Sequence, residues 1–329
     1  MSSPTKTIVI FGATGRQGGG VARTFLSLPS WHVRCITRKP TSEKALALSS
    51  LGAEMIQADM SIPSTLPPAL AGAHAIFLNT DFWETWRPLM AEGKTDPVEV
   101  SKTAYEREVE NGKNVTDAAE ESEPLERFVY SALPSLKSFS GADGKGKESR
   151  SYHPEAKAAI VRYIEEEKPA LAKKLSLLYA GAYPDNALLA PKLDPRVGKH
   201  VAGSPCAPTV KMNVLDPSTA TGPFVRCLIE DEEPGVKLLA YNDESYLSLE
   251  GFVNVWSEVT GKEAVYMRLP ADMMRQMMGI SWEHLDALTY TPDNGYDALE
   301  GVGLIRPHEL KKPPKTQSWA DWLREKEGK

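Results

Sequence analysis

The stretch KTIVIFGATGRQGGG, residues 6–20, decides the fold of this chain. Its apolar run IVIF is typical of a fully buried parallel strand, and a glycine-rich turn follows the run directly. Glycines recur there at every third position, which allows a tight turn, a close approach of the backbone to a ligand, and close packing of the next helix. Because the N–H groups that open this helix favour a phosphate, the segment predicts a dinucleotide site, with an ordinary glycine-rich loop as the alternative. The expected binding residues of the segment are Gly12, Thr14, Gly15, Arg16, Gln17 and Gly18.

Segments typical of strands and of helices alternate through the first half of the chain. Strands are expected at residues 31–38, 53–59, 74–80, 127–133 and 175–181. Helices are expected between them, the longest over residues 97–121 and another beginning after His153. Repeated units of this kind predict an α/β fold, a Rossmann-type doubly wound parallel sheet with helices on both faces.

The regular alternation ends near Tyr183, where prolines begin to interrupt the chain. We therefore expect a Rossmann domain over residues 1–183, to which the chain returns from its second half. Residues 184–329 are expected to form a smaller α/β carboxyl-terminal lobe that contacts a substrate or a partner. The glycines and charges of residues 140–149 predict a mobile loop.

The composition excludes several classes of function. The chain has 329 residues, a net charge of −6 and no basic run, so nucleic acid is not an expected direct partner. No segment approaches the length of a membrane span, the amino terminus lacks the apolar core of a signal peptide, and we expect no metal site. The 3 cysteines are scattered, which indicates reduced thiols and a cytoplasmic protein.

The residues after the second expected strand bear on the choice of nucleotide. In an open α/β sheet the ligand lies beyond the carboxyl ends of the strands, and NAD usually requires an acidic residue at this position. This chain has Arg38 and Lys39 there instead. Their charges suit a 2′-phosphate, so the sequence favours NADP over NAD. The alternative is a solvated basic pair on a surface loop.

Two further strand ends carry polar residues. Asp59, after the third strand, is placed either to hydrogen-bond an adenine amino group or to cap the next short helix. Asn79 and Thr80, after the fourth strand, are expected to contact the inner ribose and the pyrophosphate. Phe82 and Trp83 follow them, either to form a wall of the site or to pack under the long helix.

These motifs together resemble the NmrA-like family of atypical short-chain dehydrogenase/reductases. The segments that carry the resemblance are GATGRQG, TRKP, NTDFWE, GKNVTDAAEESEPLERFVYSALP and LLYAGAYPDN. The resemblance implies a Rossmann domain and a smaller lobe with a cleft between them. It also implies one of three activities, because the family includes NADP(H)-sensing regulators, reductases, and fungal tailoring proteins whose chemistry need not be redox.

The helix after the fifth strand departs from the usual catalytic pattern of short-chain dehydrogenases, Tyr-x-x-x-Lys. Lys157 stands in the expected place, and the resemblance implies a contact with the ribose or nicotinamide; a solvated helix lysine is the alternative. His153 stands where the tyrosine is expected, and Tyr152 lies one position away, about 100° around a helix. Because histidine titrates near neutral pH, His153 is a candidate proton donor, with a helix-capping or surface role as the alternative.

Other candidates lie near the ends of the fifth and sixth strands. Ser131 is a candidate to face the nicotinamide, and Tyr179 is a candidate catalytic residue near the substrate. The resemblance places Tyr183 and Asn186 at the approach to the cleft, where they would contact the cofactor. Methionines and tryptophans of the second half suit a bulky, partly aromatic substrate, or form the core of the smaller lobe.

Two functions follow from these observations. The first is a small-molecule tailoring enzyme that binds NADP(H) and carries out carbonyl or imine reduction, or a non-redox acid–base condensation and cyclisation of the Pictet–Spengler type. The second is a non-catalytic NADP(H)-sensing regulator that acts through a protein partner. The absence of tyrosine at position 153 weakens ordinary alcohol oxidation and is compatible with both functions.

Overall fold

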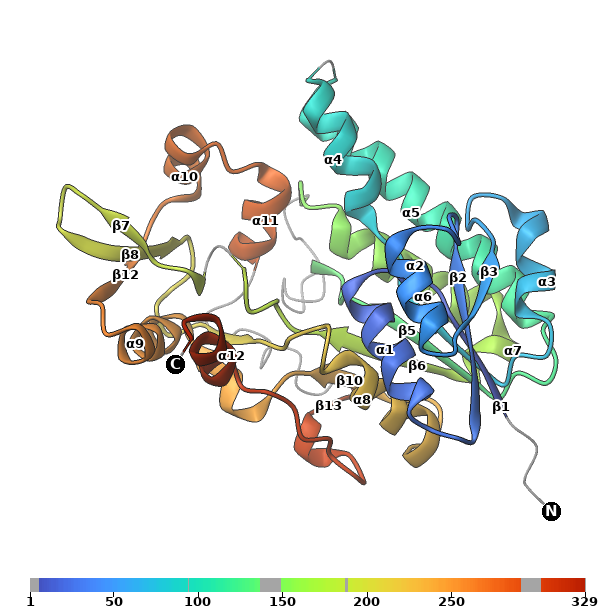
Figure 1. Ribbon diagram of the computed structural model, residues 1–329. Coiled ribbons are helices and arrows are strands. Elements are labelled where there is room, and N and C mark those ends of the chain that lie inside the picture. Colours follow the sequence, from blue (N-terminus) through green and yellow to red (C-terminus); the bar gives the residue numbers. More distant parts are fainter. Residues whose placement is uncertain (1–5, 94, 137–148, 187–188, 291–302, 329) are drawn as a thin grey trace.

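The computed structural model describes residues 6–93, 95–136, 149–186, 189–290 and 303–328 (Figure 1). The loop expected at residues 140–149 therefore lies outside the described residues, except for Ser149. The described chain forms a large sheet with helices on both faces and a smaller lobe beside it.

The large sheet has eight strands in the order β13-β10-β6-β5-β4-β1-β2-β3, and every neighbouring pair is parallel. The strands are β1 Lys6–Ile10, β2 Trp31–Thr37, β3 Glu54–Gln57, β4 Ala75–Leu78, β5 Arg127–Ala132, β6 Leu175–Ala180, β10 Lys237–Ala240 and β13 Leu304–Ile305. The Rossmann-type doubly wound sheet predicted from the sequence is confirmed. Strands β10 and β13 show that the second half of the chain returns to this sheet.

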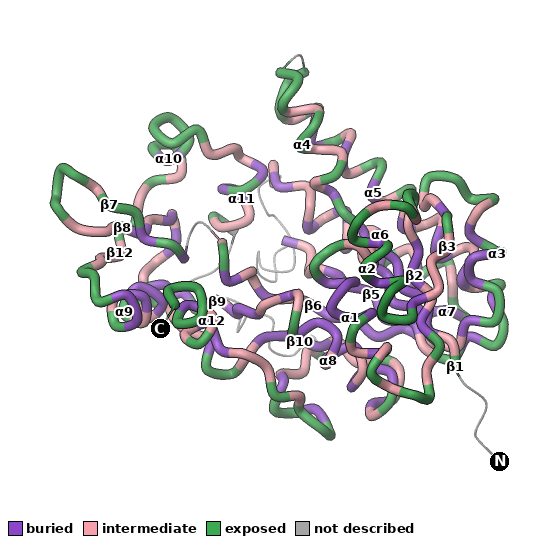
Figure 2. Tube along the Cα trace, viewed as in Figure 1, coloured by how far each residue is buried: buried purple, intermediate pink, exposed green. Residues whose placement is uncertain are grey.

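Helices cover both faces of the sheet and bury its apolar side chains. Figure 2 shows many residues of the central strands as buried. One face carries α1 Arg16–Leu26, α2 Glu43–Ser50 and α8 Thr221–Arg226, which a π-helical turn at Cys227–Asp231 continues. The other face carries α3 Leu66–Leu70, α5 Pro97–Glu120, α6 His153–Glu167 and α7 Pro169–Ala172. Short 3₁₀ turns occupy Pro63–Thr65, Asp243–Ser245 and Pro307–Glu309.

Glycines allow two pairs of helices to pack at very short range. A Cβ at Gly20 of α1 would lie 2.7 Å from the carbonyl oxygen of Ser218, and one at Gly222 of α8 would lie 2.5 Å from that of Gly20. A Cβ at Gly112 of α5 would lie 2.6 Å from Cγ1 of Ile160 on α6. The first contact joins the second half of the chain to α1, and the second aligns α5 with α6.

The smaller lobe has its own sheets and core. Strands β7 Lys192–Asp194, β8 Lys199–Ser204 and β12 Ala264–Arg268 form one sheet, and β9 Lys211–Asn213 pairs with β11 Tyr246–Ser248. The helices of the lobe are α9 Leu249–Thr260, α10 Ala271–Met278, α11 Trp282–Tyr290 and α12 Trp319–Lys326. Phe252 and Trp319 meet edge to face in its core at 5.0 Å between ring centres. The predicted smaller carboxyl-terminal α/β lobe is present, and the boundary at residue 183 stays a prediction.

Two segments differ from what the sequence predicts. Residues 82–92 form a helix, α4 Phe82–Glu92, that the sequence did not predict; Asp81 caps it by accepting a 2.9 Å hydrogen bond from the Trp83 amide. Asp216 followed by Pro217 predicts a helix that begins at residue 217, and this is wrong. The Asp216 carboxylate accepts from the Ser218 amide at 3.0 Å in a turn, and the helix starts only at Thr221.

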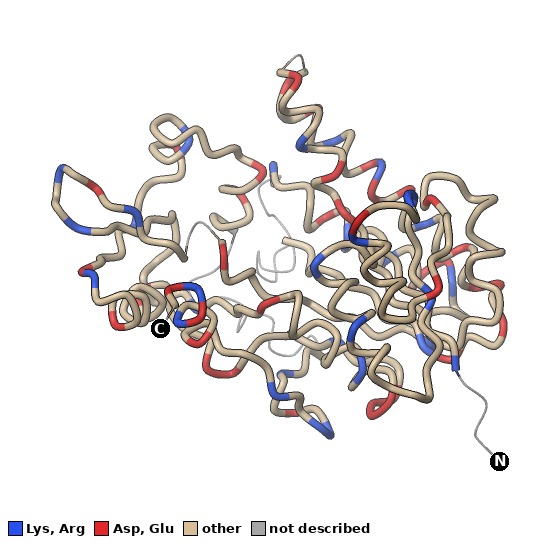
Figure 3. Tube along the Cα trace, viewed as in Figure 1, with Lys and Arg blue, Asp and Glu red and all other residues tan. Residues whose placement is uncertain are grey.

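The charged residues are mixed over both lobes, with Lys and Arg interspersed among Asp and Glu (Figure 3). Among the helices that the structure describes, none is both long enough and apolar enough to span a bilayer.

Candidate active site

The glycine turn has the geometry that a bound pyrophosphate requires. Gly12 has φ of +68°, which favours glycine, and it begins the turn directly after β1. A Cβ at Gly18 would lie 2.9 Å from the Ala13 Cα and would overlap the Gly12 carbonyl group, so only glycine fits. Gly15 is the N-cap of α1 in extended conformation, and no side chain caps the first turn. The cradle therefore fits an anion at the positive end of α1.

A chain of hydrogen bonds links the turn to the ends of β5 and β6. The buried Ser131 hydroxyl donates to Oε1 of Gln17 at 2.6 Å, and Nε2 of Gln17 donates to the Tyr183 hydroxyl at 3.0 Å. Burial raises the pKa of Tyr183, while the hydrogen bond from Gln17 opposes this rise. The Arg16 guanidinium lies 4.8 Å from the centre of the Tyr183 ring and pairs with Asp185 at 2.9 Å. The structure thus brings four of the predicted residues into one network.

The two basic residues after β2 differ in their surroundings. Arg38 forms an ion pair with Glu84 of α4, and both side chains are exposed. Lys39 is exposed, and its backbone amide donates to the Thr37 hydroxyl at 3.2 Å. A 2′-phosphate at this place would therefore compete with Glu84 for the guanidinium of Arg38. Glu84 lies in the helix that the sequence analysis missed.

Asp59 and Asn79 occupy the ends of β3 and β4. Asp59 accepts hydrogen bonds from the Ser61 amide at 2.9 Å and the Ser61 hydroxyl at 2.8 Å, so it stabilises a turn. Asp59 does not cap the next short helix, because neither the 3₁₀ turn at Pro63–Thr65 nor α3 has a side-chain cap. The adenine contact stays a prediction. Asn79 lies against the glycine turn, since a Cβ at Gly12 would meet the Asn79 carbonyl oxygen at 3.3 Å and its Nδ2 at 3.5 Å.

Lys157 lies in a buried polar cluster. Its Nζ donates to the carbonyl oxygen of Thr80 at 2.9 Å and lies 3.1 Å from Oε1 of Glu108, a side chain of α5 with 0% exposure. The Thr80 hydroxyl donates to the same Glu108 oxygen at 2.6 Å and lies 3.0 Å from the Tyr130 hydroxyl. Burial raises the pKa of Tyr130 well above its ordinary value, and the charge of Glu108 adds to the rise. Lys157 is therefore not a solvated helix lysine.

His153 is the first residue of α6 and is held by a carboxylate of the smaller lobe. Its Nδ1 lies 2.8 Å from Oε1 of Glu283, which also accepts from the backbone amides of Tyr152 at 2.8 Å and His153 at 2.9 Å. The Glu283 side chain is 1% exposed. The rings of Trp83 and Phe82 lie 5.0 and 6.0 Å from the imidazole. Because His153 precedes Lys157 by four residues, both project from one face of the helix.

A cavity of about 350 Å³ lies between α4, the start of α5 and the α10–α11 segment. Its apolar lining consists of Trp86, Met90, Pro97, Val98, Ile280 and Trp282. Two cations also line it: the Arg150 guanidinium lies 3.4 Å from the centre of the Trp282 ring, and that of Arg275 lies 5.8 Å away. Arg150 pairs with the buried Asp286 at 3.0 Å. Glu283, the partner of His153, belongs to the same lining.

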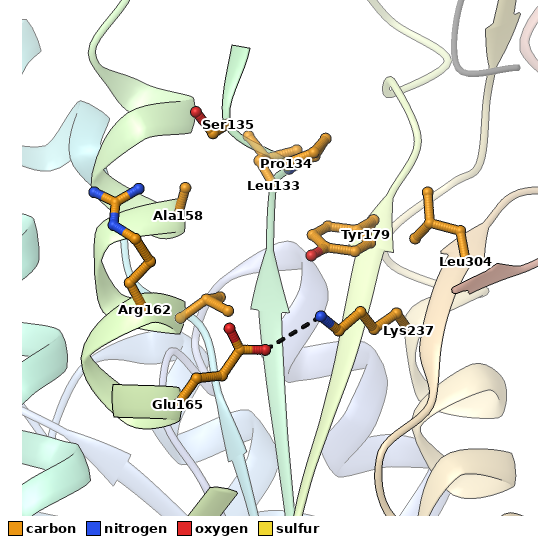
Figure 4. A pocket seen from close by; sticks show the side chains of 10 residues that line it. Leu133, Pro134, Ser135, Ala158, Arg162, Glu165, Tyr179, Lys237 and Leu304 are labelled. Atoms are coloured by element: carbon orange, nitrogen blue, oxygen red, sulfur yellow. Dashed lines mark hydrogen bonds and ion pairs between the residues drawn. The ribbon is translucent and has the colours of Figure 1, made fainter. Parts of the chain in front are cut away.

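Tyr179 is not part of either cluster. It lines a separate cavity of about 240 Å³ on the α6 side of the sheet, with Leu133, Lys237 and Leu304 (Figure 4). Lys237 and Glu165 form an ion pair of 3.2 Å across this cavity. The structure therefore does not bring Tyr179 together with His153. Asn186 follows Tyr183 in a turn, where its amide donates to the Tyr183 carbonyl at 2.9 Å.

An all-parallel sheet with a glycine cradle at its carboxyl edge defines a Rossmann-type dinucleotide-binding fold. The chain belongs to the NmrA-like family, whose model matches residues 4–323. It is 35% identical over 161 residues to the NmrA-like family domain-containing oxidoreductase notA of Aspergillus sp. (strain MF297-2). This alignment covers 49% of the chain and 42% of that relative, less than half of the relative's length.

Solved structures show the same fold at low identity. The negative transcriptional regulator NmrA in complex with NADP superimposes with a TM-score of 0.65 at 18% identity, covering 98% of this chain and 91% of that one. Isoflavone reductase superimposes with a TM-score of 0.69 at 16% identity, covering 98% and 99% of the two chains. The atypical short-chain dehydrogenase/reductase fold therefore occurs in both a regulator and a reductase.

Three carboxylates of the site were not identified from the sequence: Glu84, Glu108 and Glu283. Each pairs with a basic residue that the sequence analysis did single out. Glu108 lies on the buried face of α5. An acidic residue among the apolar positions of a helix usually has a buried partner, and this pattern could have pointed to Glu108.

Proposed function

We propose that this protein is an NADP(H)-binding enzyme that acts on a small molecule, with His153 as its acid–base group. The observation that carries the proposal is the His153–Glu283 pair, which stands one helical turn from Lys157 and takes the place of the usual tyrosine. A buried carboxylate bonded to Nδ1 holds the imidazole in one orientation and leaves Nε2 to exchange a proton with substrate.

The residues at the carboxyl edge of the sheet fit an NADP cofactor. The glycine turn would hold the pyrophosphate, Arg38 and Lys39 the 2′-phosphate, and Asn79 and Thr80 the inner ribose side. Arg16 and Gln17 lie at the rim of the turn, joined to Tyr183. NmrA has been solved with NAD and with NADP, and the basic pair after β2 is what favours NADP here. When bound as NADPH, the cofactor would supply a hydride.

The residues around His153 suit either of two reactions. In carbonyl or imine reduction, protonated Nε2 of His153 gives its proton to the substrate oxygen or nitrogen as the adjacent carbon is reduced. In an amine–aldehyde condensation with cyclisation, the same nitrogen takes a proton from one substrate atom and returns it to another. Phe82 and Trp83 pack beside the ring and limit the access of water. Reduction is favoured by the name of the notA relative, an oxidoreductase.

The cavity beside Glu283 supports a bulky, partly aromatic substrate. Trp86 and Trp282 provide flat apolar surface, and Arg275 provides a cation suited to a carboxylate or carbonyl group. A substrate seated there would lie next to the Glu283–His153 pair. The cytoplasmic location is part of the same proposal, in keeping with three free cysteines.

The test is to purify the protein, identify the nucleotide that copurifies, and assay carbonyl, imine and amine–aldehyde substrates. NADPH consumption with product indicates a reductase, and product without consumption indicates non-redox catalysis. Tight association with a protein partner, together with no turnover of any substrate, would instead indicate a non-catalytic regulator.

The decisive variant is His153→Gln, which should lower kcat by about 100-fold or more and leave the Kd for NADPH unchanged. His284→Gln is the matched control, because His284 stacks on Trp83 at 4.8 Å but lacks the bond to Glu283 Oε1 that His153 makes. Equal activity in the two variants would remove His153 from the mechanism.

A further inference from the structure

The buried Glu108 has no place in the proposed reaction, yet it is the most enclosed carboxylate of the site. Its side chain has 0% exposure, and one oxygen, Oε1, takes both the Thr80 hydroxyl at 2.6 Å and the Lys157 ammonium at 3.1 Å. The other oxygen, Oε2, is buried without a hydrogen-bond partner among the described residues. A cation beside it strongly stabilises an ionised carboxylate in such a position.

In the same way, the negative charge of Glu108 balances the positive charge of Lys157, 3.1 Å away. Among the described residues, Nζ also contacts the carbonyl and hydroxyl oxygens of Thr80 and lies 5.7 Å from the centre of the Tyr130 ring, and none of these groups carries a net charge. The pair as a whole is therefore close to neutral, although it sits at the carboxyl end of β4, where a ligand of a parallel sheet binds. A lone lysine at this place would be a net positive charge in surroundings from which water is largely excluded.

We infer that Glu108 is a charge-balancing residue that sets the relative affinity of the site for oxidised and reduced nicotinamide. The inference rests on the proposed cofactor site. The oxidised nicotinamide ring carries a positive charge and the reduced ring is neutral, whereas the rest of the nucleotide is the same. A net positive charge at Lys157 would therefore weaken NADP⁺ binding and leave NADPH binding nearly unchanged, because only NADP⁺ is repelled.

The test is the ratio of the Kd for NADP⁺ to the Kd for NADPH, measured by titration calorimetry on the full chain. Glu108→Gln leaves Lys157 charged, and it should raise this ratio by about tenfold. Lys157→Met leaves Glu108 charged, and it should lower the ratio. The double variant has no net charge, and its ratio should return close to that of the natural protein even if both affinities fall.

Glu110→Gln is the matched control, because it makes the same charge change at an exposed position of α5 and should leave the ratio unchanged. If Glu108 had only a structural role, its loss would weaken the binding of NADP⁺ and NADPH equally. An unchanged ratio of the two Kd values in Glu108→Gln would therefore overturn the inference. If Glu108→Gln does not fold, the other two variants decide the question. Lys157→Met should lower the ratio of the two Kd values, and the double variant should restore it. A natural protein that binds neither nucleotide would instead refute the proposed cofactor site.

Discussion

The glycine turn and the start of α6 meet at the same edge of the sheet but are built in different ways. The turn is made of backbone, and the atoms that determine its shape lie within residues 12–18. The end of α6 is made of side-chain pairs, and its histidine and carboxylate stand 130 positions apart in the sequence. The turn should therefore tolerate side-chain changes except at its glycines, whereas α6 depends on partners from other elements.

The largest effect is expected at Gly18. Gly18→Ala places a Cβ against the Gly12 carbonyl group, so the turn must open, and nucleotide affinity should fall by about 100-fold. Calorimetric titration with NADPH measures the loss. Gly19→Ala is the control, since its Cβ would meet only the Ala13 carbonyl oxygen at 3.2 Å and a flexible arginine. If both variants lost the same affinity for NADPH, the loss would come from replacing any glycine of α1 and not from the shape of the turn.

A second large effect should follow from breaking the buried ion pair. Lys157→Met leaves Glu108 charged and unpaired, which should lower the free energy of unfolding by about 3 kcal/mol in urea denaturation. The double variant with Glu108→Gln should recover most of this loss, because no charge is then buried. A double variant as unstable as Lys157→Met would show that packing, not charge, holds this end of α6.

The third effect tests the contact between the lobes. Glu283→Gln removes the carboxylate that holds His153, and it should reduce kcat by about tenfold to 100-fold without changing nucleotide affinity. Asp286→Asn is the comparison, because Asp286 is an equally buried acid of α11 that pairs with Arg150 instead. Steady-state kinetics on both variants separate the orientation of His153 from the docking of α11. Similar kcat values for the two would contradict an orienting role.

The smallest effect is expected at the exposed pair after β2. Glu84→Gln frees Arg38 for a 2′-phosphate and should raise the preference for NADP over NAD by about threefold, since an exposed ion pair contributes little energy. Arg38→Gln should shift the same ratio in the opposite direction. Glu92→Gln, at the exposed end of α4, serves as the control. A ratio that neither Arg38→Gln nor Glu84→Gln changes would remove Arg38 from the phosphate site.

The sequence predicted the sheet and the glycine cradle because both depend on short-range patterns. Apolar strands separated by helices require a parallel sheet, and the spacing of Gly12, Gly15 and Gly18 specifies the turn. The helix α4 escaped prediction because its cap, Asp81, and its proline, Pro88, resemble those of a loop. The four-residue spacing of His153 and Lys157 was also visible in the sequence, since i and i+4 share one helix face.

The partners of these two residues were not visible. Nothing in the sequence near Lys157 points to Glu108, and nothing near His153 points to Glu283, because an ion pair depends on the distance between side chains and not on their separation along the chain. The crossing of α5 and α6 at Gly112 brings Glu108 to Lys157. The docking of α11 on the start of α6 brings Glu283 to His153.

The sequence by itself therefore determined the family, the parallel sheet and the turn suited to a dinucleotide, because local backbone sterics act between near neighbours in the chain. Only the tertiary structure decided which charged groups of that site lie side by side and how its histidine is held. Buried charges interact strongly at short distance and weakly otherwise, so their effect appears only when folding has placed the partners within reach of each other.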